Sequence, residues 1–186
     1  MNIFHFIVYC ILIVCLYYFT YSLATSYQRN ETCSQVSLVI WVIDTIDLFI
    51  HETGHLIFGI LGRFIGILGG SLFQVIIPVA TVLVFAKSTL RSIPFTLYWT
   101  GQSIVNVSIY IGDAPYQRLH LISRAAIHDW KWLLNYTGTM EYAGDLAMIV
   151  NIIGLLTCCI GIGIGFYFMT HDSLRLLSPE EYQHTE

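Results

Sequence analysis

Long apolar runs dominate this sequence and set the strongest limit on its fold. Apolar residues make up 56% of the 186 positions and charged residues only 11%, whereas a soluble domain usually carries about 25% charge. A run of about 20 apolar residues can cross a bilayer as a helix. Because a lipid-exposed backbone must satisfy its own hydrogen bonds, helices are the favoured spanning structure. The sequence therefore predicts an all-α, multi-pass integral membrane protein in contact with the lipid bilayer.

We expect about five membrane spans within a single transmembrane domain over residues 1–186. The candidate runs cover approximately residues 3–23, 36–61, 72–86, 94–111 and 143–169. The first run lacks lysine or arginine at its start and shows no small-x-small cleavage site, which favours a retained span over a signal peptide. The polar loop that follows it contains Cys33 and a glycosylation sequon at Asn30.

The stretch from Gly59 to Gly70 is unusually rich in glycine, which weakens a continuous helix. A re-entrant or strand-like loop is expected here, of the kind tolerated at membrane depth where it lines protein or a wet cavity. The alternative is an ordinary tight turn between two spans.

Charge and cysteine content exclude several classes of function. The net charge is -4 and no basic stripe is present, so the sequence predicts no nucleic-acid partner. The chain has five cysteines but no CxxC pair, which supports neither a disulfide framework nor a cysteine metal site.

The sequence His51-Glu52-Thr53-Gly54-His55 lies within the second apolar run and matches the HExxH pattern. On a helix, residues i and i+4 stack on one face, so His51 and His55 can both face one metal ion. Glu52 sits beside that face, where it can accept a proton from water. Ionisable residues in an apolar run are functional candidates, and the pattern predicts a zinc site. Alternatively, the histidines hydrogen-bond neighbouring helices, which leaves Glu52 unpaired.

Two aspartates precede the motif on the same helical face. At about 100° per residue, Asp44, Asp47, His51 and His55 fall within an arc of about 80°. Histidines that bind metal usually donate their second N–H to a carboxylate or carbonyl. Asp47 or Asp44 could accept that hydrogen bond from His51. The alternative is that both aspartates lie near the aqueous surface and are solvated.

A catalytic zinc needs a third protein ligand and an open position. Asp113 is the first choice, because it ends the fourth run, whose polar face contains Asn106. His128 or Asp129 is the second choice. The alternative for that pair is a surface turn that Trp130 anchors at the membrane interface.

The arrangement of HExxH in one run with Asn106 and Asp113 two runs later resembles the site-2 protease family of intramembrane zinc metalloproteases. The resemblance covers residues 36–114. Val107 and Ala114 stand where that family typically has proline and glycine. The chain looks most similar to compact membrane peptidase-like relatives that share stretches similar to residues 51–55, 69–74, 110–114 and 128–130. No PDZ-like insertion is present.

The resemblance implies zinc bound by His51, His55 and Asp113, with Glu52 as the general base. It also implies a membrane protein or peptide as substrate, cut in or near a transmembrane segment. The competing hypothesis is a non-catalytic pseudoprotease or a metal-binding membrane interaction protein. Zinc content and cleavage of a membrane peptide would distinguish the two.

Overall fold

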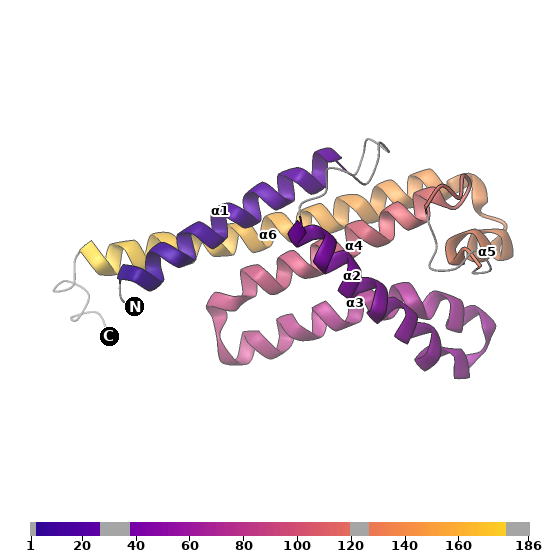
Figure 1. Ribbon diagram of the computed structural model, residues 1–186, viewed down its shortest axis with the longest axis horizontal. Coiled ribbons are helices and arrows are strands. Elements are labelled where there is room, and N and C mark those ends of the chain that lie inside the picture. The colour runs from indigo at the N-terminus through magenta and orange to yellow at the C-terminus, as the bar shows by residue number, and fades with distance from the viewer. Residues whose placement is uncertain (1–2, 27–37, 120–126, 178–186) are drawn as a thin grey trace.

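The computed structural model describes residues 3–26, 38–119 and 127–177, and this part of the chain is all-α (Figure 1). Its α-helices are α1 (Ile3–Ser26), α2 (Leu38–Phe58), α3 (Arg63–Ser88), α4 (Ile93–Asp113), α5 (Asp129–Thr137) and α6 (Ala143–Leu177). Three short 3₁₀ turns precede α3, α4 and α6, namely η3 (Gly59–Leu61), η4 (Leu90–Ser92) and η5 (Met140–Tyr142). Cys33 and the sequon at Asn30 lie outside the described residues.

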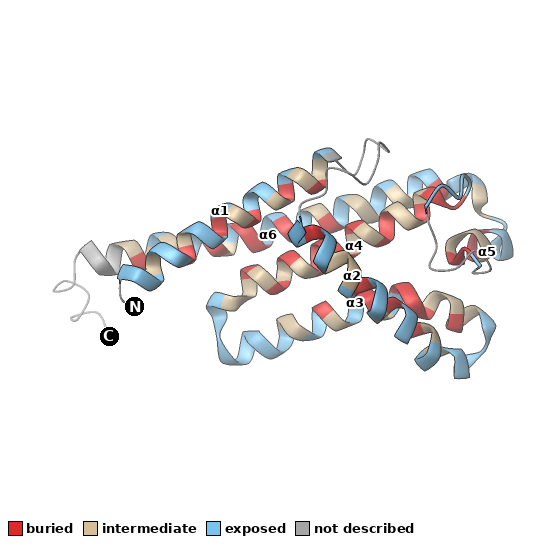
Figure 2. Ribbon diagram, viewed as in Figure 1, coloured by how far each residue is buried: buried red, intermediate tan, exposed pale blue. Residues whose placement is uncertain are grey.

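Within the described residues, three helical stretches are long and apolar enough to cross a membrane. They cover Ile3–Thr25, Arg63–Ser88 and Met140–Ser173. Large apolar side chains stay exposed along the first of them, such as Phe4 at 67% and Ile11 at 58% (Figure 2). An apolar surface of this kind is what a lipid-facing helix presents. Helices α2 and α4 coincide with the other two predicted runs, and the count of five spans stays a prediction.

Helices α1 and α4 both pack along α6, and the start of α1 lies beside the end of α6 (Figure 1). Helices α4 and α6 approach closely because both carry glycine at their contact. A Cβ atom on Gly101 would lie 2.6 Å from the Gly154 carbonyl oxygen, and a Cβ on Gly154 would lie 2.8 Å from the Gly101 oxygen. Small residues at such positions let two membrane helices pack backbone against backbone.

Helix α2 packs against α3, and here the glycine-rich stretch departs from expectation. The chain breaks at Gly62, with φ of 100°, and is then α-helical from Arg63 onward, so the predicted re-entrant loop is not confirmed. The glycines lie at the contact with the preceding segment. A Cβ on Gly66 would lie 2.9 Å from the Gly59 Cα atom, and a Cβ on Gly54 would collide with the Gly69 carbonyl oxygen. Close packing therefore offsets the cost of glycine in a helix, about 1 kcal/mol per residue.

Candidate metal centre

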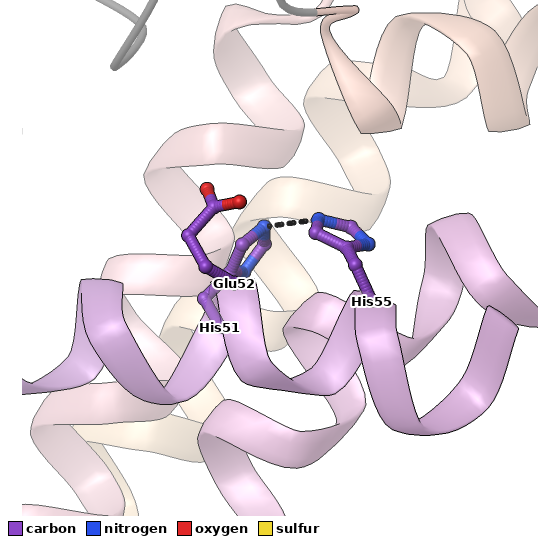
Figure 3. A group of neighbouring side chains, drawn as sticks. All are labelled: His51, Glu52 and His55. Carbon is purple, nitrogen blue, oxygen red and sulfur yellow. Dashed lines mark hydrogen bonds between the residues drawn. The ribbon is translucent and has the colours of Figure 1, made fainter.

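The two histidines of the HExxH sequence face each other on α2. Figure 3 shows their imidazoles on the same side of the helix, with Glu52 beside them. The Nε2 atoms of His51 and His55 are 3.1 Å apart. Potential ligand atoms of His51, Glu52 and His55 all lie within 4.8 Å of one another. The predicted i, i+4 stacking thus brings two imidazole nitrogens to one point.

Asp129, the first residue of α5, completes this group. Its Oδ2 atom lies 2.9 Å from His51 Nε2 and 3.2 Å from His55 Nε2. The three atoms form a nearly regular triangle. Tetrahedral zinc with ligand distances of about 2.0–2.2 Å places its ligand atoms about 3.3 Å apart. The triangle therefore has the size and the donor types of a zinc site.

Contacts from two other helices fix the start of α5 in this place. The Asp129 backbone N–H donates to the Tyr110 hydroxyl on α4, at 3.2 Å. The Trp130 indole N–H donates to the Ser71 hydroxyl on α3, at 3.0 Å. His128 caps the helix by accepting a hydrogen bond from the Lys131 backbone N–H at its Nδ1 atom. Both His128 and Asp129 are buried, so this segment is not the exposed surface turn that the sequence left open.

The second nitrogen of each histidine has an oxygen partner. His55 Nδ1 lies 2.8 Å from the Gly66 carbonyl oxygen, and His51 Nδ1 lies 3.2 Å from Gln74 Oε1. Because these oxygens can only accept, each Nδ1 carries a proton, and in the neutral imidazole this leaves a lone pair on Nε2. Two lone pairs and a carboxylate oxygen then converge without a donor of their own, which is the arrangement that a bound cation stabilises.

Gly70 on α3 leaves the space that such an ion needs. A Cβ atom at this position would lie 2.6 Å from His51 Nε2 and 2.7 Å from His55 Nε2. Every other amino acid would therefore place carbon against the two metal-facing nitrogens. Glu52 is exposed and His55 is partly exposed, so solvent reaches this end of the group. A catalytic zinc requires such access for the water that it activates.

The carboxylate of Asp129 is in the state that a metal ligand requires. Burial on its own raises the pKa of Asp129. In the metal-free protein His51 and His55 can each take up a proton at Nε2 and donate it to this carboxylate, and these hydrogen bonds outweigh burial and hold the pKa of Asp129 below its ordinary value. Asp129 is therefore ionised at neutral pH, and its negative charge favours a cation at the centre of the triangle.

Asp113, the first choice for the third ligand, contacts His128, the residue before Asp129, and not the histidines of α2. Its carboxylate accepts hydrogen bonds from the backbone N–H groups of Arg118 and Leu119, at 2.8 and 3.0 Å. His128 Nε2 is 3.3 Å from Asp113 Oδ2. Asp113 thus braces the end of α4 and the residue before Asp129. Among the described residues, Asp129 is the carboxylate that reaches both His51 and His55.

The two aspartates upstream of the motif contact α4. Asp47 accepts hydrogen bonds from the Trp99 indole at 2.9 Å and the Ser103 hydroxyl at 2.7 Å. Asp44 accepts hydrogen bonds from the side-chain amides of Gln102 and Asn106. The group that contacts His51 Nδ1 is Gln74 instead, which sequence reasoning did not single out. A glutamine within an otherwise apolar run was the available signal.

Comparison of the chain with protein-family models, with curated proteins and with solved structures finds no significant match.

Proposed function

We propose that this chain is a zinc metallopeptidase that hydrolyses a peptide bond in or near a membrane-spanning segment. The observation that carries the proposal is the triangle of His51 Nε2, His55 Nε2 and Asp129 Oδ2, with sides of 2.9 to 3.2 Å. Sequence resemblance to the site-2 protease family supports the same reaction. The structure favours Asp129 over Asp113 as the third ligand in this proposal.

Each residue has a distinct role in the proposed reaction. His51, His55 and Asp129 hold the zinc, which when bound acts as a Lewis acid toward water and the substrate carbonyl. Glu52 accepts a proton from the attacking water and passes it to the leaving amine. Its exposed side chain leaves it free to exchange that proton with the substrate.

The surface around Glu52 favours an apolar substrate. Phe49 is 70% exposed and Leu56 is 79% exposed on the same helix, so a peptide that approaches Glu52 meets apolar side chains on either side. A transmembrane segment suits this surface. Its helix must unwind locally before cleavage, because the peptide groups of a helix are engaged in internal hydrogen bonds.

The test compares purified wild-type protein with Glu52→Gln in a detergent or vesicle assay on a generic membrane peptide. Glu52→Gln keeps the size and polarity of the side chain but removes the proton acceptor. We expect unchanged zinc content and a loss of cleavage of about 10²–10⁴-fold, the usual range for a general base. Thr53→Val is the matched control, because the Thr53 hydroxyl donates within α2 to the Phe49 carbonyl oxygen.

The pseudoprotease hypothesis predicts another outcome in the same assay. Wild-type protein would hold zinc, bind the membrane peptide and leave it uncut, and Glu52→Gln would bind it equally well. That result would replace the hydrolase with a metal-dependent binding protein.

A further inference from the structure

A line of side-chain hydrogen bonds crosses three helices and ends at His51. The Asn106 amide on α4 donates through Nδ2 to the Asp44 carboxylate on α2, at 3.1 Å. Gln74 on α3 donates through Nε2 to Asn106 Oδ1, at 2.9 Å. Gln74 Oε1 then lies 3.2 Å from His51 Nδ1. The line starts and ends on α2 and passes through both neighbouring helices.

The carboxylate at the start of this line determines the direction of every bond in it. Asp44 accepts from the Asn106 NH₂ group, which turns the Asn106 oxygen toward Gln74. Gln74 must then donate to Asn106, which turns the Gln74 oxygen toward His51.

We propose that Gln74 is a positioning residue that keeps a proton on His51 Nδ1 and thereby keeps His51 Nε2 free for metal. The proposal rests on the metal site proposed above and names a residue that this site depends on. The need for such a residue follows from Asp129. Its carboxylate lies 2.9 Å from His51 Nε2, so in the absence of metal it attracts the imidazole proton to the nitrogen that must bind metal.

The two histidines solve this problem by different means. His55 Nδ1 donates to the Gly66 backbone carbonyl at 2.8 Å, a partner that no substitution removes. His51 depends on a side chain, which can be replaced. Gln74 is itself buried, with 4% of its surface exposed, so water does not readily take its place. Replacing Gln74 should therefore affect His51 and spare His55.

The first experiment follows the imidazole protons of metal-free protein by ¹⁵N-edited NMR, with the His51 signals assigned from their loss in His51→Ala. In wild type we expect His51 Nδ1 to carry a proton. In Gln74→Leu we expect a population with a bare Nδ1 and a proton on Nε2. Gln74→Glu should restore the wild-type pattern, because a carboxyl group in either protonation state offers an oxygen to Nδ1–H.

The second experiment measures zinc affinity by competition with a chelator. Gln74→Leu should bind zinc about 10–100-fold more weakly, the usual effect of losing the partner of a ligating histidine. Gln74→Glu should bind within a few-fold of wild type. Gln102→Leu is the matched control, because Gln102 is a fully buried glutamine that also contacts Asp44 but lies off the line to His51.

Two results would overturn the proposal: a fully protonated His51 Nδ1 in Gln74→Leu, or equal losses of zinc affinity in Gln74→Leu and Gln102→Leu. The proton measurement needs neither zinc nor a substrate. It therefore tests the positioning role even when the protein cleaves no peptide, and failure of the hydrolase is seen separately in the Glu52→Gln comparison.

Discussion

Two regions of this molecule bury their surfaces by different chemistry. In the apolar bundle of α1, α4 and α6, the core residues Ile13, Val105 and Cys158 are fully buried. In the polar cluster, where α2, α3 and α5 meet the near face of α4, the fully buried residues include Asp47, Gln102 and Ser103. Apolar burial needs only close packing, whereas each buried polar group needs a partner to offset its desolvation.

The two regions differ in how strictly they constrain the identity of individual side chains. One ion pair in the apolar bundle joins Arg91 of η4 to Asp172 of α6, through two bonds of 2.6 and 2.9 Å. The hydrogen bonds to Asp172 raise the pKa of Arg91, so the pair stays charged. In the polar cluster the bonds instead lead from helix to helix toward His51. An apolar interior tolerates volume-conserving changes, but a directed network loses its effect when one member changes.

Of the substitutions considered in the two regions, removal of Asp129 should have the largest effect on zinc affinity. Asp129→Ala takes away one corner of the proposed zinc triangle, and we expect a loss of zinc affinity of more than about 100-fold, beyond the usual range for an outer-shell partner. Asp113→Ala removes the partner of His128 and the acceptor of two backbone N–H groups but no proposed zinc ligand, so its effect should stay within about 10–100-fold. Chelator competition on both purified variants gives the ranking. Greater loss in Asp113→Ala would return the ligand role to Asp113.

The contrast between these two aspartates shows what the sequence can predict. The long helices coincide with the apolar runs, although α3 begins at Arg63, well before the run predicted at 72–86. The stacking of His51 and His55 follows from the helical repeat alone. The identity of the third ligand does not follow from the helical repeat, because it depends on how the chain after α4 turns back onto α2. The backbone contact of Asp129 with Tyr110 holds that turn, and no periodicity encodes it.

The glycine-rich stretch is a second case where local reasoning was insufficient. Low helix propensity favoured a loop, but the glycines of α3 lie where α2 comes closest. A Cβ on Gly69 would lie 2.9 Å from the Phe58 ring and 3.0 Å from the Gly54 carbonyl oxygen. Tertiary packing overrides propensity at such a contact. The sequence shows how many glycines are present but not which helix they face.

Gly70→Ala tests the polar cluster with a change of one methyl group. The added Cβ meets the outer ends of the His51 and His55 side chains and not backbone, so the imidazoles should move while the helices stay. We expect a marked loss of zinc affinity, about 10-fold or more, with thermal stability within about 1 kcal/mol of wild type. Gly144→Ala is the control, since a Cβ there meets nothing within 4 Å. Unchanged zinc affinity in Gly70→Ala would place the ion elsewhere.

Gly154→Ala applies the same change to the apolar bundle, where the opposite pattern is expected. The new Cβ would lie 2.8 Å from the Gly101 carbonyl oxygen and 2.9 Å from the Val105 backbone nitrogen. Backbone atoms cannot turn aside as a side chain can, so α4 and α6 must separate. We expect a loss of stability of about 1–3 kcal/mol, typical of overpacking, measured by thermal unfolding in detergent.

Zinc affinity per folded molecule should stay within about two-fold of wild type in Gly154→Ala, because the contact lies in the apolar bundle and not beside the imidazoles. Gly163→Ala on the same helix is the control: a Cβ there meets nothing within 4 Å, and alanine should leave stability unchanged or raise it by about 0.5–1 kcal/mol. If Gly154→Ala instead weakened zinc binding as much as Gly70→Ala, the two regions would be coupled through α4. The separation between apolar packing and the directed polar network would then fail.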